Sequence, residues 1–120
     1  MGIQNPSEDV ILVELPPDSL KIAEELKAVN ETISKNGGCD IIVDFSRVEI
    51  INSSNISNLL ILRSLLQRSG RQLILCNVAT MTKCIFVVAG LNEVFVFADN
   101  KSAAMAAVQS ANSPPSANLH

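Results

Sequence analysis

Short apolar runs alternate along this chain with longer stretches in which apolar residues recur every three or four positions. The clearest run, residues 40–45, is almost continuously apolar, as in a strand that is covered on both faces. The stretch before it has helical spacing, is capped by Asp18 or Ser19 and is stopped by Gly37 and Gly38. Its apolar positions are Ile22, Leu26, Val29 and Ile33. This alternation predicts a largely parallel sheet packed with helices.

The same patterns divide the rest of the chain into further elements. We expect strands at residues 10–15, 71–77 and 93–97, and helices at residues 53–69 and 102–109. The core stripe of the 53–69 helix is Leu59, Leu62 and Leu66. A short third helix before Gly90 is marked by Met81, Cys84, Ile85 and Val88. The fold class is therefore α/β, with a mostly parallel or mixed sheet of four to five strands and about four helices.

The domain organisation follows from where these elements begin and end. We expect an N-terminal leader at residues 1–9, a single domain at residues 10–109 and a disordered tail at residues 110–120. A chain of 120 residues is long enough to bury one core without disulfides or metal. The start of the chain lacks the basic and apolar regions of a signal peptide, and the apolar run at 85–91 is too short to span a bilayer.

Composition and charge argue against several classes of function. Aromatic residues make up only 3% of the chain, which disfavours stacking on single-stranded nucleic acid. The net charge of -3 disfavours binding to a phosphate backbone. The three cysteines, Cys39, Cys76 and Cys84, lack a paired Cys-x-x-Cys spacing and fit a reduced, cytoplasmic setting.

Catalytic motifs are missing from the sequence. The sole histidine is His120, in the predicted tail, so neither a zinc site nor a Ser-His-Asp triad is expected. No glycine-rich phosphate cradle follows the first strand. Asp40 and Asp44 flank a strand, where polar residues are ordinary. We therefore expect a binding protein rather than an enzyme, with no metal and no cofactor.

The segment 44–55, Asp-Phe-Ser-Arg-Val-Glu-Ile-Ile-Asn-Ser-Ser-Asn, joins a predicted strand to a predicted helix. Ser53 and Ser54 stand where that helix begins, and serine there is a natural cap. Asn52 is an equally good cap, and Asn55 tolerates turn conformations. A helix start also favours an added phosphate. The segment predicts a capped helix, a phosphorylation switch, or both.

This segment resembles the signature of STAS domains, the family of bacterial anti-sigma factor antagonists. That signature reads Asp-Leu-Ser, a spaced Val, a large apolar residue and then Asp-Ser-Ser/Thr-Gly, and the resemblance covers residues 10–109. It implies that Ser54 is the phosphoacceptor, in a switch loop with Asn52, Ser53 and Asn55. It also implies that the chain binds an anti-sigma factor that is a serine kinase, that phosphorylation ends this binding, and that a phosphatase restores it.

Two residues depart from that signature, which leaves other functions open. Asn52 stands for the family's aspartate and Asn55 for its glycine. One alternative is a STAS subunit that docks on the ATPase of a lipid-type ABC transporter. Another is a phosphorylation-silent scaffold subunit of a signalling assembly, and a third is nucleotide binding without hydrolysis. Direct contact with nucleic acid or membrane is not expected, and self-association is left open.

A docking surface for the partner is also predicted. Ile56, Leu60 and Arg63 lie on one edge of the 53–69 helix, and Phe86 lies on a side of the third helix. If these side chains are exposed, apolar groups ringed by polar ones suit partner binding. The competing interpretation is a wide apolar stripe that faces the core.

Overall fold

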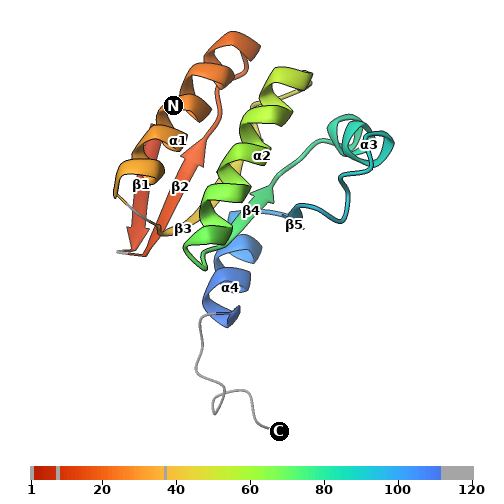
Figure 1. The fold of residues 1–120 in the computed structure, drawn as a ribbon. Coiled ribbons are helices and arrows are strands. Elements are labelled where there is room, and N and C mark those ends of the chain that lie inside the picture. Colours follow the sequence, from red (N-terminus) through yellow and green to blue (C-terminus); the bar gives the residue numbers. More distant parts are fainter. Residues whose placement is uncertain (1, 8, 37, 112–120) are drawn as a thin grey trace, which may run out of the picture.

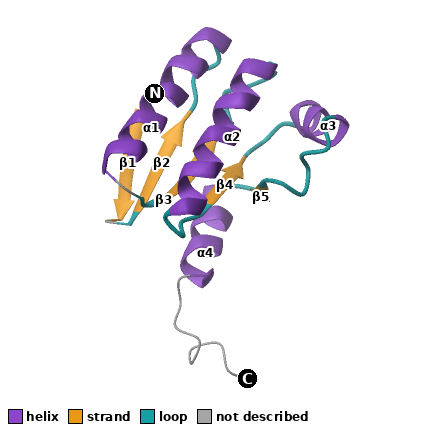
Figure 2. Ribbon diagram, viewed as in Figure 1, coloured by secondary structure: helices purple, strands orange, loops and turns teal. Residues whose placement is uncertain are grey.

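A five-stranded sheet, orange in Figure 2, forms the centre of the computed structural model, which describes residues 2–7, 9–36 and 38–111. Its strands lie in the order β1-β2-β3-β4-β5. The first pair is antiparallel, and the pairs from β2 to β5 are parallel. The strands are β1 (Gly2–Ser7), β2 (Val10–Glu14), β3 (Asp40–Asp44), β4 (Leu73–Cys76) and β5 (Val96–Ala98).

Helices connect the parallel strands and cover the sheet. They are α1 (Ser19–Asn36), α2 (Ser53–Arg68), α3 (Thr80–Val88) and α4 (Lys101–Ala111). Helices α1 and α2 lie side by side over one face, and α4 covers the other (Figure 1). Figure 1 shows α3 beyond the carboxyl end of β4, at a distance from the other helices. Within the described residues, no helix has the length and apolar character needed to cross a membrane.

The core lies on both faces of the sheet, as the central strand requires. All five residues of β3 are buried, which confirms the prediction of a strand covered on both faces. The larger cluster packs under α1 and α2, and the smaller one packs under α4. The predicted core stripes of α1 and α2 are confirmed, since the following residues are buried: Ile22, Leu26, Val29, Ile33, Leu59, Leu62 and Leu66.

Both ends of the domain differ from the prediction. Residues 2–7, expected as part of a leader, form β1 and pair with β2, so that Ile3 lies opposite Val13. If these residues did not form a strand, the edge of β2 that faces away from β3 would have no strand to pair with. At the other end, α4 continues to Ala111, and the rest of the predicted tail lies outside the described residues.

Helix α3 turns toward the core a different face from the one that its apolar residues suggest. Thr82 and Phe86 are its buried residues, whereas Met81 is 68% exposed and Val88 is 88% exposed. The Phe86 ring packs edge-on against the rings of Phe95 and Phe97, with centroids 5.4 and 5.5 Å away. The prediction that Phe86 contributes to a partner surface is therefore wrong, because its ring is part of the core.

Candidate functional site

The first turn of α2 begins directly after Asn52, at the carboxyl end of the parallel strands. Asn52 has extended backbone angles (φ -108°, ψ 174°), and its Oδ1 accepts a hydrogen bond from the Asn55 N–H at 2.9 Å. This contact satisfies one of the backbone donors that a helix start leaves without a partner. Asn52 is therefore the residue that caps α2.

The two serines of this turn are exposed. Neither Ser53 nor Ser54 makes a side-chain hydrogen bond to another of the described residues, because Asn52 has taken the capping role. The first turn also contains no acidic side chain. The hydroxyl groups are thus presented to solvent beside the positive end of the helix dipole.

Asn55 lies in the same turn but faces inward. Its side chain is fully buried, and neither its amide nitrogen nor its amide oxygen has a hydrogen-bond partner among the described residues. It aligns with Leu59 and Leu62 on the buried face of α2. The expectation that Asn55 forms part of an exposed switch loop is therefore corrected, because its side chain does not border the approach to Ser54.

Asp44 holds the start of the connection between β3 and α2. Its Oδ1 accepts hydrogen bonds from the Ser46 N–H at 3.0 Å and from the Asn77 Nδ2 at 2.9 Å, and its Oδ2 accepts one from the Ser46 Oγ at 3.2 Å. Lys101 lies 3.8 Å from the same carboxylate and donates to Glu14 at 2.9 Å, a hydrogen bond that raises the Lys101 pKa. The Asp44 carboxylate thus joins the connection between β3 and α2 to Asn77, which follows β4, and to Lys101, which follows β5.

The same connection also contacts α3. The Thr82 Oγ1 donates a hydrogen bond to the Glu49 carbonyl oxygen at 3.1 Å. The next residue, Ile50, is 62% exposed. Helix α3 also turns an apolar surface outward, which we call the α3 apolar face; its residues are Met81, Cys84, Ile85 and Val88. An exposed apolar side chain, Ile50, therefore lies two residues before the cap of α2, in a connection that is hydrogen-bonded to α3.

The model of the family described as STAS domain matches residues 9–104. The chain belongs to the STAS domain family. No curated protein sequence matches it.

Solved structures with the same fold include anti-sigma factor antagonists. An anti-sigma-factor antagonist (STAS) domain protein from Planctomyces limnophilus is 18% identical, with 89% of this chain and 97% of that one covered and a TM-score of 0.76. A sulfate transporter family protein from Wolinella succinogenes is 21% identical, with 89% and 90% covered and a TM-score of 0.74. The phosphorylated form of the Bacillus cell fate determinant SpoIIAA is 20% identical, with 88% and 97% covered and a TM-score of 0.66. The TM-scores show that these proteins share the fold of this chain, and at such low identities the likeness shows the fold alone.

The predicted partner residues of this STAS domain do not form one exposed patch. Ile56 and Leu60 are partly buried and pack against the larger core cluster. Arg63 is partly buried, and its Nε donates a hydrogen bond to the Val94 carbonyl oxygen at 2.8 Å. Phe86 is in the core. Only the edges of the first three side chains are available to a partner.

Sequence reasoning missed the exposure of Ile50 and of the α3 apolar face. Apolar residues lie on every side of α3, so spacing alone does not say which side is buried. The one available signal was the position of Phe86, since the largest side chain of a short helix gains most from burial.

The cysteines show no arrangement for metal or redox chemistry. Among the described residues, no group of three or more cysteine, histidine or acidic side chains could hold a metal ion. All three cysteines are free: Cys39 is partly buried, Cys76 is buried and Cys84 is exposed. Burial, with a smaller effect of Asp44, raises the pKa of Cys76 to about 12, so its thiol stays protonated at neutral pH.

Proposed function

We propose that this STAS domain is an anti-sigma factor antagonist that acts by partner switching. It binds an anti-sigma factor that is also a serine kinase, and phosphorylation of Ser54 ends that binding until a phosphatase removes the phosphate. The observation that carries this proposal is the exposed hydroxyl of Ser54 in a helix turn that Asn52 already caps.

The electrostatics of the turn support a phosphorylated state that stays folded. A phosphate adds about -1.5 to -2 charges and three acceptor oxygens. A negative charge at a helix N-terminus is favoured by roughly 0.3–1 kcal/mol, and no acidic side chain of the first turn of α2 opposes it. A docked partner would instead have to desolvate the new dianion, which costs several kcal/mol when no group compensates it. Phosphorylation therefore weakens docking without unfolding the domain.

The surface that we assign to the partner combines Ser54 with exposed apolar groups on the same side of the domain. Ile50 and the α3 apolar face supply those groups, and the hydrogen bond from Thr82 to Glu49 fixes α3 against the connection that contains Ile50. An exposed apolar patch of this kind is a common mark of protein binding. The edges of Ile56 and Leu60 extend it along α2.

A pull-down from the native host tests the proposal. The baits are the wild type, Ser54→Asp and the matched control Ser53→Asp, which places the same charge on the adjacent exposed serine. We expect a kinase-like anti-sigma factor to be held by the wild type and by Ser53→Asp, and to be lost by Ser54→Asp. One unchanged set of partners for all three baits would rule the switch out.

The same experiment addresses a second candidate, docking in a transporter. A structure with this fold is described as a sulfate transporter family protein, so the STAS fold also occurs in that setting. Recovery of transporter ATPase or permease subunits in place of a kinase would favour that function.

A further inference from the structure

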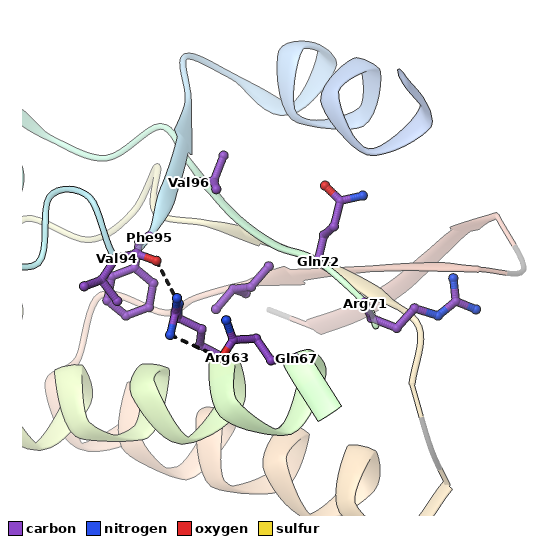
Figure 3. A pocket seen from close by; sticks show the side chains of 8 residues that line it. Arg63, Gln67, Arg71, Gln72, Val94, Phe95 and Val96 are labelled. Carbon is purple, nitrogen blue, oxygen red and sulfur yellow. Dashed lines mark hydrogen bonds between the residues drawn. The ribbon is translucent and has the colours of Figure 1, made fainter. Parts of the chain in front are cut away.

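We propose that a pocket between the second half of α2 and the first residues of β4 and β5 binds a carboxylate group on a small apolar body. The pocket has a volume of about 170 Å³. Its lining residues, seen in Figure 3, are Arg63, Gln67, Arg71, Gln72, Leu73, Val94, Phe95 and Val96. This inference goes beyond the switch at Ser54 and does not depend on it.

The guanidinium of Arg63 supplies the positive charge of the pocket. Its Nε donates to the Val94 carbonyl oxygen at 2.8 Å, and its Nη1 donates to the Gln67 Oε1 at 3.4 Å (Figure 3). Among the described residues, no carboxylate forms an ion pair with Arg63, and no hydrogen bond uses its Nη2. A half-buried guanidinium without a counter-charge retains donors for a carboxylate, which accepts two parallel hydrogen bonds from it.

Arg71, the second arginine of the pocket, has a different role. Its Nη2 lies 3.9 Å from the Asp9 carboxylate, and its Nη1 lies 3.8 Å from the Asp40 carboxylate. In Figure 3 its guanidinium points away from Arg63. The charge of Arg71 is therefore partly compensated within the domain, and the Arg63 charge is left for a ligand.

The remaining walls define what the carboxylate is attached to. Leu73 and Phe95 are buried apolar residues, and Val96 is 56% exposed at the mouth. The amide groups of Gln67 and Gln72 complete the lining. The volume lies below the roughly 300–1,000 Å³ of sites for drug-sized ligands. A short aliphatic acid and the C-terminal carboxylate of a peptide both match this chemistry.

The pocket is separate from the switch surface. Arg63 follows Ser54 by nine positions on α2, which is about 13 Å along the helix axis at about 1.5 Å per residue. The pocket also lies where β4 begins, whereas the connection to Ser54 starts where β3 ends. A ligand in the pocket therefore leaves the turn at Ser54 open.

The decisive experiment is a titration of the isotope-labelled protein, followed by amide chemical shifts at constant ionic strength. Isobutyrate and isobutyramide have the same shape and differ in charge. We expect isobutyrate to shift the amides of residues 63, 67, 72 and 94–96 in a saturable way, and isobutyramide to bind at least tenfold more weakly. Equal effects of the two compounds, or no saturable shift at these residues, would overturn the proposal.

Substitutions then locate the site. Arg63→Gln is expected to weaken isobutyrate binding at least tenfold, whereas Arg68→Gln, the same change at an exposed position outside the pocket, leaves it unchanged. If Arg63→Gln does not fold, Arg63→Lys keeps the charge without the planar fork and is expected to weaken binding as well. Binding that none of these substitutions alters would place the ligand elsewhere and refute the assignment.

Peptides distinguish the two sources of the carboxylate. A tetrapeptide ending in Ala-Leu is compared with its C-terminal amide in the same titration. Tighter binding of the free acid than of isobutyrate assigns the pocket to a protein C-terminus, and weaker binding assigns it to a small organic acid.

Discussion

Asn52 and Asn55 are three positions apart in one helical turn, but their side chains lie in opposite environments. The Asn52 side chain is exposed and its oxygen accepts the capping hydrogen bond, whereas the Asn55 side-chain amide is buried without a hydrogen-bond partner among the described residues. The first arrangement stabilises the helix, and the second costs the free energy of desolvating an amide. The two asparagines are therefore expected to respond differently to the same substitution.

Asn52→Ala is expected to lower the free energy of unfolding by about 1 kcal/mol, because the Asn55 N–H loses its acceptor. Urea unfolding measures the change. Ser53→Ala is the matched control, since the exposed Ser53 side chain makes no hydrogen bond to another described residue. Equal losses for the two variants would contradict the assignment of Asn52 as the cap.

Asn55→Ala is expected to leave the free energy of unfolding unchanged or to raise it. The substitution removes a buried amide whose desolvation costs about 1–3 kcal/mol, and this gain offsets the packing that is lost. Leu59→Ala, on the same buried face, is expected to cost about 2–5 kcal/mol. If calorimetry gives both variants a similar loss, Asn55 has a partner that stabilises it.

The free energy of unfolding is expected to fall at alkaline pH because of Cys76. Burial raises its folded pKa to about 12 from an ordinary value of 9.0, so above pH 9 the unfolded chain loses the thiol proton while the folded chain keeps it. The unfolded state then binds fewer protons, and stability falls as the pH rises toward 12. Cys76→Ala is expected to show a shallower fall in urea unfolding over that range. The same slope in both proteins would assign the effect to other groups.

At the scale of the elements, α3 buries only two residues and contributes three exposed large apolar side chains, those of Met81, Val87 and Val88. Phe86 and Thr82 anchor it, one through aromatic packing and the other through a hydrogen bond. The rest of the helix presents apolar side chains outward. Stability therefore depends on one face of these nine residues, and the proposed partner surface uses another.

Phe86→Ala is expected to lower the free energy of unfolding by about 3–5 kcal/mol, because it removes a fully buried ring. Val88→Ser is expected to change it by less than about 0.5 kcal/mol, because Val88 is exposed. Chemical denaturation measures both values. In the pull-down described above, Val88→Ser is expected to recover less of the partner. Full recovery would remove the α3 apolar face from the docking surface.

The helices differ in how far the sequence predicts them. In α1 and α2 most apolar residues lie on one face, so periodicity identified their buried positions, such as Leu26 and Leu62. In α3 the buried face is decided by Phe95 and Phe97, which follow in the chain and whose positions periodicity does not give. Asn55 was missed for a related reason, because a polar residue on a buried face contradicts the pattern that predicts burial.

For the whole molecule, the order of strands and helices was predictable and the edge strands were not. The central strands β3 and β4 are fully buried, and each has a run of at least three apolar residues, which makes their pattern strong. Strand β1 is mostly polar, so its pattern is weak, and it forms by pairing with β2. Strand β5 begins at Val96, three residues later than predicted, because the backbone N–H groups of Val94 and Phe95 instead bond back to Leu91.

The whole domain is expected to tolerate a negative charge at Ser54. Ser54→Asp places a carboxylate in the first turn of α2, where the helix dipole stabilises it by roughly 0.3–1 kcal/mol. Thermal unfolding of Ser54→Asp is therefore expected at or above the wild-type midpoint. A clear fall in the midpoint would mean that any loss of partner binding reflects unfolding, and the switch would need another explanation.

The two edges of the sheet also bear on how the molecule behaves at high concentration. Strand β5 has only three residues, and the pairing of β1 with β2 changes register between Gln4 and Ser7. Short or irregular edges give a strand from another molecule little backbone to bond with. Growth of sheets from molecule to molecule is thus disfavoured, and crowding is expected to bring copies together through side-chain surfaces that separate again on dilution.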